Sequence, residues 1–132
     1  MTLLKLIDLA NLTDRNPTYA EVEGLDLVVV RYGAQASVLY GRCHHRGALL
    51  ADGYIEGNNL ICGLHHWDYR YDTGVSEYNN EERLHKFYSE IKDDAVWVDL
   101  NEIREFQKNN PQPFDREAYL GKYADTHPES TE

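Results

Sequence analysis

The sequence is poor in cysteine, in basic residues and in long apolar runs. It has two cysteines in 132 residues, too few for a small secreted domain held together by disulfides. No apolar run approaches the roughly 20 residues that cross a bilayer. The first 14 residues also lack the basic start and small-residue cleavage site of a signal peptide. These absences predict a cytoplasmic protein whose cysteines are buried thiols or metal ligands.

Lysine and arginine are outnumbered by acidic residues. There are 13 basic side chains against 23 acidic ones, and the formal net charge is -10. Nucleic acids and anionic membranes would repel such a surface, so neither is expected as a partner. The charge suits docking against a basic face of another protein, or it is simply an acidic, soluble surface. Charge alone does not separate these two interpretations.

Short β-branched and tyrosine-rich segments, separated by turn residues, predict an all-β protein. We expect an antiparallel β-sandwich or open barrel, with the first strand also compatible with a short helix. The last two strands should form a hairpin around Asp93-Asp94. The expected strands cover residues 3–9, 18–23, 25–32, 35–42, 59–63, 67–72, 84–92 and 95–99.

The last 30 or so residues differ in character from the strands. Asn101–Lys108 predicts a short helix, prolines follow it, and the end of the chain from about residue 124 is expected to be disordered. We therefore predict one domain over residues 1–100 and a helical extension with a tail over 101–132.

Motifs for substrate chemistry are also missing. The sequence has no glycine-rich phosphate loop and no Ser-His-Asp arrangement that its spacing supports. The acidic pairs Glu81-Glu82 and Asp93-Asp94 lie at turn-like sites, where we expect solvated side chains. No catalytic residue is predicted, and no small-molecule substrate.

What the sequence does have is a histidine at a short offset from each cysteine. The first half is Cys43-His44-His45 and the second is Cys62-Gly63-Leu64-His65. Each half follows a predicted strand, so two loops could hold a metal between them. Two thiolates and two imidazoles suit zinc or an iron–sulfur cluster. Classical zinc fingers place both cysteines before both histidines, whereas here each loop carries one of each.

The longer pattern resembles the Rieske protein family. It consists of Cys43-x-His45-Arg46-Gly47 followed by Cys62-x-x-His65-x-Trp67-x-Tyr69. The Arg-Gly after the first histidine and the tryptophan after the second resemble the Rieske domains of ring-hydroxylating oxygenases most. The resemblance extends over about residues 3 to 100. Three departures are His44 and Gly63 where proline is common, His66 where glycine is common, and the lack of a second cysteine pair.

The resemblance implies a Rieske-type sandwich with a small cluster-binding subdomain of two loops. Cys43 and Cys62 would bind one iron of a [2Fe–2S] cluster, and His45 and His65 the other. Further residues near the cluster would be Arg46, Gly47, Trp67 and Tyr69. His44 and His66 are expected to be loop residues. Trp67 stands where high-potential members have a serine, which implies a potential near the low end of the Rieske range, about -150 mV.

Three functions remain open from the sequence. The first is a one-electron carrier between a flavoprotein reductase and a terminal redox enzyme. The second is a domain or small subunit of a larger redox enzyme, either an oxygenase or a glutamate-synthase-like FMN protein. Residues 72–87 and 111–127 resemble Rieske modules that precede such FMN proteins. The third is a zinc-binding interaction module. An oxygenase catalytic subunit is not expected, since no second iron domain fits after residue 100.

Overall fold

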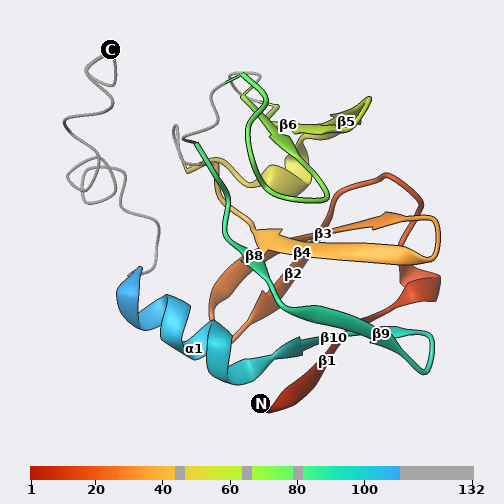
Figure 1. Cartoon of the computed structure of the whole chain (residues 1–132), viewed down its shortest axis with the longest axis vertical. Coiled ribbons are helices and arrows are strands. Elements are labelled where there is room, and N and C mark those ends of the chain that lie inside the picture. The colour runs from red at the N-terminus through yellow and green to blue at the C-terminus, as the bar shows by residue number, and fades with distance from the viewer. Residues whose placement is uncertain (44–46, 64–66, 79–81, 111–132) are drawn as a thin grey trace.

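Antiparallel strands are the main regular elements of the computed structural model, which describes residues 1–43, 47–63, 67–78 and 82–110 (Figure 1). The elements in these ranges are β1 (Leu3–Asp8), η1 (Leu9–Asn11), β2 (Thr18–Val22), β3 (Leu25–Tyr32), β4 (Gln35–Tyr40), η2 (Leu50–Asp52), β5 (Tyr54–Glu56), β6 (Asn59–Ile61), β7 (Asp68–Arg70), β8 (Lys86–Phe87), β9 (Ser89–Lys92), β10 (Ala95–Asp99) and α1 (Leu100–Asn109). The η elements are short 3-10 helices. The all-β prediction is confirmed.

The largest sheet has the strand order β2-β3-β4-β8. Its central strand, β3, is an almost unbroken run of β-branched and leucine residues, and four consecutive residues from Leu27 to Val30 are buried. A strand covered on both faces favours such a run over strict alternation. β3 pairs with β4 in the register Leu27↔Tyr40 to Tyr32↔Gln35. This register decides where β4 leaves the sheet toward the first cysteine.

A second sheet has the order β1-β10-β9. The turn between β9 and β10 contains Asp93 and Asp94, whose φ angles are 54° and 58°. Two successive residues with positive φ suit a tight hairpin turn, and aspartate tolerates this conformation better than most residues. The predicted last hairpin is confirmed.

The single strand predicted over 84–92 is wrong, because the segment forms two strands and the first of them begins only at Lys86. The segment is interrupted at Tyr88, so that β8 belongs to the first sheet and β9 to the second. Tyr88 itself belongs to neither sheet. Its backbone amide is nevertheless hydrogen-bonded, because it donates to the Glu102 carboxylate at 2.8 Å. The crossing connects the two sheets.

The third sheet has the order β5-β6-β7, and its strand β6 leads directly to the second cysteine. Figure 1 shows β5 and β6 at the opposite end of the molecule from α1. β5 was not predicted, because its three residues lie in a polar stretch that was expected to be loop. One hydrophobic core nevertheless joins all three sheets, with Val28, Leu60 and Val96 among its members.

Helix α1 closes the other end of the sandwich and confirms the predicted short helix. It begins at the N-cap Asp99, whose side chain accepts a hydrogen bond from the Asn101 amide at 3.0 Å. Ile103 is fully buried, and the ring of Phe106 lies 5.0 Å from that of Tyr40. No helix in the described ranges is long and apolar enough to span a membrane. The end of the chain from about residue 124, predicted to be disordered, lies outside those ranges.

Candidate metal centre

The first predicted metal loop begins where β4 leaves β3. At that point the Gly41 amide donates to the Asp26 carbonyl at 2.8 Å. A Cβ on residue 41 would lie 2.8 Å from the Asp26 carbonyl carbon and oxygen and from the Leu27 nitrogen, closer than real Cβ atoms come to backbone. Glycine therefore lets the chain leave the sheet in contact with β3. Cys43 follows two residues later.

Hydrogen bonds close this first loop at its base. The Cys43 amide donates to the Ala48 carbonyl at 2.8 Å, and the Gly47 amide donates to the Cys43 carbonyl at 2.7 Å. Gly47 has φ of 74°, a conformation that glycine adopts without strain. Below them, the Leu50 amide donates to the Gly41 carbonyl at 2.8 Å. Cys43 is 1% exposed, so the loop presents its thiol toward the core.

The second loop has the same closure. Cys62 follows β6, and its amide donates to the Trp67 carbonyl at 2.8 Å, one step beyond the β6–β7 pair Ile61↔Asp68. In both loops the cysteine amide thus bonds to the carbonyl five residues later. Cys62 is also 1% exposed. Two loops with the same closure, each starting at a buried cysteine, match the two-loop subdomain that the sequence predicts.

The two loops are packed against each other at their bases. A Cβ on Gly53, just after η2, would lie 2.0 Å from the Ile61 carbonyl oxygen. A Cβ on Gly63 would lie 3.1 Å from the Asp52 carbonyl oxygen. The backbone that leaves the first loop therefore lies directly on the start of the second, and glycine at residue 53 permits this approach.

Tyr69, in β7, connects the β6–β7 hairpin to the first cysteine. Its side chain is fully buried, and its hydroxyl lies 3.7 Å from the Cys43 Sγ atom. Trp67, also predicted near the cluster, is partly buried and packs on the hydrophobic core. Of the residues predicted near the cluster, Gly47, Trp67 and Tyr69 therefore lie at the two loops.

The histidines His45 and His65, together with Arg46, lie outside the described residues. In the sequence, they fall between the hydrogen-bonded ends of the two loops. Within the described ranges, no three His, Cys, Asp or Glu side chains form a group that could hold a metal. Cys43 and Cys62 form no disulfide. Two buried thiols on adjoining loops, each with a histidine two or three positions later, fit a cluster with two sulfur and two nitrogen ligands.

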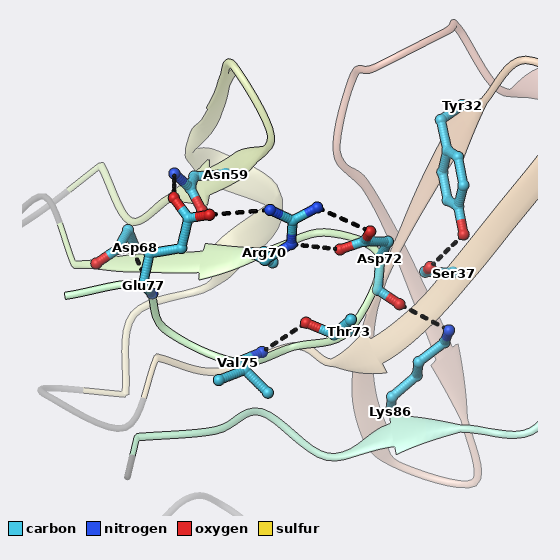
Figure 2. Close-up of polar contacts among 10 residues, drawn as sticks. All are labelled: Tyr32, Ser37, Asn59, Asp68, Arg70, Asp72, Thr73, Val75, Glu77 and Lys86. Carbon is cyan, nitrogen blue, oxygen red and sulfur yellow. Dashed lines mark hydrogen bonds and ion pairs between the residues drawn. The ribbon is translucent and has the colours of Figure 1, made fainter. Parts of the chain in front are cut away.

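A polar network holds the chain after β7 against the β6–β7 hairpin (Figure 2). Arg70 Nε and Nη2 donate to the two carboxylate oxygens of Asp72, each at 3.0 Å, and Nη1 donates to Glu77 at 2.9 Å. Asn59 also donates to Glu77 at 3.0 Å. The bond from Arg70 lowers the pKa of Asp72, and the bonds from Asn59 and then Arg70 lower that of Glu77. These carboxylates are therefore ionised and paired.

The acidic pairs differ from their prediction at one position. Asp93 and Asp94 are exposed in their turn, as expected, but Glu82 is 3% exposed. The prediction for Glu82 is wrong, because this residue pairs with Ser76, and both side chains are buried. The Ser76 amide donates to the Glu82 carbonyl at 3.0 Å. Glu81 lies outside the described residues.

Nothing in the sequence indicated an ion pair at the first loop. Arg42 donates from Nε to the Asp26 carboxylate at 2.8 Å and from Nη1 to the Gly47 carbonyl at 2.9 Å. Tyr19 donates to the other oxygen of Asp26 at 2.7 Å, and this bond raises the pKa of Tyr19 to about 12. No local motif joins these residues, since only the β2–β3–β4 pairing brings them together.

Comparison with known proteins agrees with this arrangement. The family model described as "Rieske [2Fe-2S] domain" matches residues 2–88. A ferredoxin from Sphingomonas yanoikuyae B1 has a similar structure, with a TM-score of 0.68 and 25% identity, over 74% of this chain and 98% of that one.

Two curated proteins are similar over shorter shares of their length. Methylxanthine N1-demethylase NdmA of Pseudomonas putida is 28% identical over 105 residues, 72% of this chain and 29% of that protein. The alpha subunit of phenoxybenzoate dioxygenase from Ectopseudomonas oleovorans is 39% identical over 64 residues, 48% of this chain and 15% of the subunit. The chain therefore spans less than a third of either protein.

Proposed function

This chain belongs to the Rieske [2Fe-2S] domain family, and on that premise we propose that it carries single electrons between two redox proteins. Rieske domains bind a [2Fe–2S] cluster, which supplies reversible one-electron chemistry when bound. The observation that carries the proposal is the matched pair of loops, each closed at a buried cysteine, in a fold similar to a ferredoxin over 98% of that protein's length.

We assign the ligands by the family's offsets. Cys43 and Cys62 hold the inner iron, and their burial keeps water from the sulfur ligands. His45 and His65 hold the outer iron, and neutral imidazoles in place of two thiolates raise the potential above that of all-cysteine clusters. Tyr69 donates to the Cys43 thiolate. This assignment leaves His44 and His66 as neighbours of the ligands.

The partners follow from charge and from the family. A net charge of -10 favours a redox partner with a basic docking face, such as a flavoprotein reductase, an oxygenase or an FMN enzyme. The chain acts on no small molecule of its own in this proposal. We place the protein in the cytoplasm, a reducing compartment in which Cys43 and Cys62 stay available as cluster ligands.

A second candidate is a module or small subunit of a larger redox enzyme. It is favoured by helix α1 and the residues after it, which extend beyond the part matched by the family model, and by the short share of the curated proteins that the chain spans. Affinity purification of the intact protein from its own cells separates the two. A stoichiometric flavoprotein or oxygenase partner supports the subunit, and recovery of the chain alone supports the carrier.

Ligand exchange tests the assignment. His45→Cys and His65→Cys should each lower the reduction potential wherever a cluster assembles, because an anionic ligand replaces a neutral one. His44→Cys and His66→Cys are the matched controls, and each should leave the visible and EPR spectra of the wild type intact. A potential unchanged in the first two variants would show that the wrong histidines are assigned. A colourless wild-type protein that binds zinc would support an interaction module instead.

A further inference from the structure

The Asp26–Arg42 ion pair lies at the base of the first cluster loop and is connected to it on both sides. Arg42 directly precedes Cys43, and its guanidinium donates from Nη1 to the Gly47 carbonyl at 2.9 Å. Gly47 in turn donates its amide to the Cys43 carbonyl at 2.7 Å. The guanidinium therefore bonds to the same short segment whose other end holds the first sulfur ligand.

Asp26 orients this arginine from the sheet. Its carboxylate accepts from Arg42 Nε at 2.8 Å and from the Tyr19 hydroxyl at 2.7 Å, so both oxygens are used. Its backbone carbonyl accepts the Gly41 amide at 2.8 Å. The side chains of Asp26 and Arg42 are 15% and 29% exposed, less than either partner of the surface pair Glu23–Arg104, at 42% and 58%. Solvent screens the Asp26–Arg42 charges correspondingly less.

We propose that Arg42, oriented by Asp26, is a positioning residue for the cluster that also sets its reduction potential. This inference rests on the proposed function, because it requires a cluster in the loop. The planar guanidinium holds the loop at Gly47 while its charge favours the reduced state, in which the cluster carries one more electron. The Asp26 carboxylate opposes that charge. The two residues thus act together on the loop's shape and in opposite directions on the potential.

The direction of the shift in reduction potential distinguishes this role from a purely structural one. Asp26→Asn and Arg42→Gln break the same ion pair, so a purely structural role predicts the same kind of damage from both. The proposal predicts a higher potential for Asp26→Asn and a lower one for Arg42→Gln. A change of about threefold in the one-electron equilibrium constant corresponds to about 28 mV at 59 mV per tenfold. Arg42→Lys keeps the charge without the fork, so it should shift the potential less than Arg42→Gln but lose the cluster faster than the wild type.

The experiment is an anaerobic redox titration of the cluster-loaded full chain, followed by visible absorption and EPR. Glu23→Gln is the matched control, because it also removes one arginine-paired carboxylate but on the β2–β3 turn, where Glu23 bonds to Arg104 of α1. It should leave the potential unchanged. Shifts of equal sign in Asp26→Asn and Arg42→Gln, or a Glu23→Gln shift as large as that of Asp26→Asn, would overturn the proposal.

Two further outcomes are decisive. Should Arg42→Gln fail to retain a cluster, Asp26→Asn alone carries the test, and a potential at or below that of the wild type overturns the proposal. A wild-type chain without a reduced [2Fe–2S] signal would overturn the proposed function itself, and the inference with it. A normal wild-type signal with the wrong pattern of shifts would overturn the inference alone.

Discussion

Removing one oxygen atom from Tyr69 should lower the reduction potential measurably. In Tyr69→Phe the ring remains in its fully buried site, while the hydroxyl 3.7 Å from the Cys43 Sγ atom is lost. A cluster-bound thiolate has no proton, so Tyr69 is the donor in this contact. The bond strengthens as negative charge on the sulfur grows, and it therefore favours the reduced state.

The size of the effect follows from the bond's net worth. A hydrogen bond contributes about 0.5–1.5 kcal/mol net. At 1.36 kcal/mol and 59 mV per tenfold change, the same energy is about 20–65 mV of potential. We expect the potential of Tyr69→Phe to be lower than that of the wild type by an amount within this range, because the bond stabilises the reduced state more than the oxidised state. Protein-film voltammetry of wild type and variant, under the same buffer and salt, measures the difference directly.

A second tyrosine provides the control. The Tyr32 hydroxyl lies 3.2 Å from the Ser37 hydroxyl, between neighbouring strands of the large sheet (Figure 2). Tyr32→Phe removes the same atom from a contact that does not involve sulfur, so its potential should stay at the wild-type value. A Tyr69→Phe potential equal to or above that of the wild type would refute the assignment of Tyr69 as a donor to Cys43.

Two other perturbations test how the subdomain is held. Gly53→Ala should expel the cluster and lower the unfolding midpoint, because its Cβ would lie 2.0 Å from the Ile61 carbonyl oxygen; a variant with wild-type cluster content and melting temperature would contradict this close approach. Asp72 has a lowered pKa because Arg70 bonds to it, so its contribution to stability is present above about pH 4, the unfolded value, and is lost as the pH falls through the lower folded value. Urea midpoints measured by circular dichroism should therefore fall less between pH 5 and pH 3 in Asp72→Asn than in the wild type, and equal slopes would show that the Arg70–Asp72 pair contributes nothing.

Local sequence patterns were sufficient wherever an element is stabilised mainly by its own residues. The strand Leu25–Tyr32 and the strand Ala95–Asp99 were predicted with the observed bounds, because each is a β-rich run between turn residues. The helix was predicted over Asn101–Lys108, within one residue of its observed bounds at each end. The two cysteines were predicted as metal ligands or buried thiols, and their burial agrees with both. The longer pattern around them, with Arg46-Gly47 after the first histidine and Trp67 after the second, indicated the family.

What sequence could not supply depends on contacts between distant segments. Nothing local indicates that the strand predicted over 84–92 changes sheets at Tyr88, since no glycine or proline marks the break. Asp26 and Arg42 come together only through the register of β3 with β4, which places Asp26 beside Gly41. The burial of Glu82 likewise goes with its pairing to Ser76, six residues earlier in the chain. In each case, tertiary pairing determines the environment of a residue whose neighbours in sequence give no sign of it.

The most direct test of the central claim is pulsed EPR of the reduced protein with ¹⁵N-labelled histidine. We expect a [2Fe–2S] signal coupled to two histidine nitrogens, with one coupling lost in His45→Cys and the other in His65→Cys. Both histidine nitrogen couplings should persist in His44→Cys and in His66→Cys. An EPR-silent reduced protein, or a cluster signal without histidine nitrogen couplings, would contradict the assignment of this chain as a Rieske electron carrier.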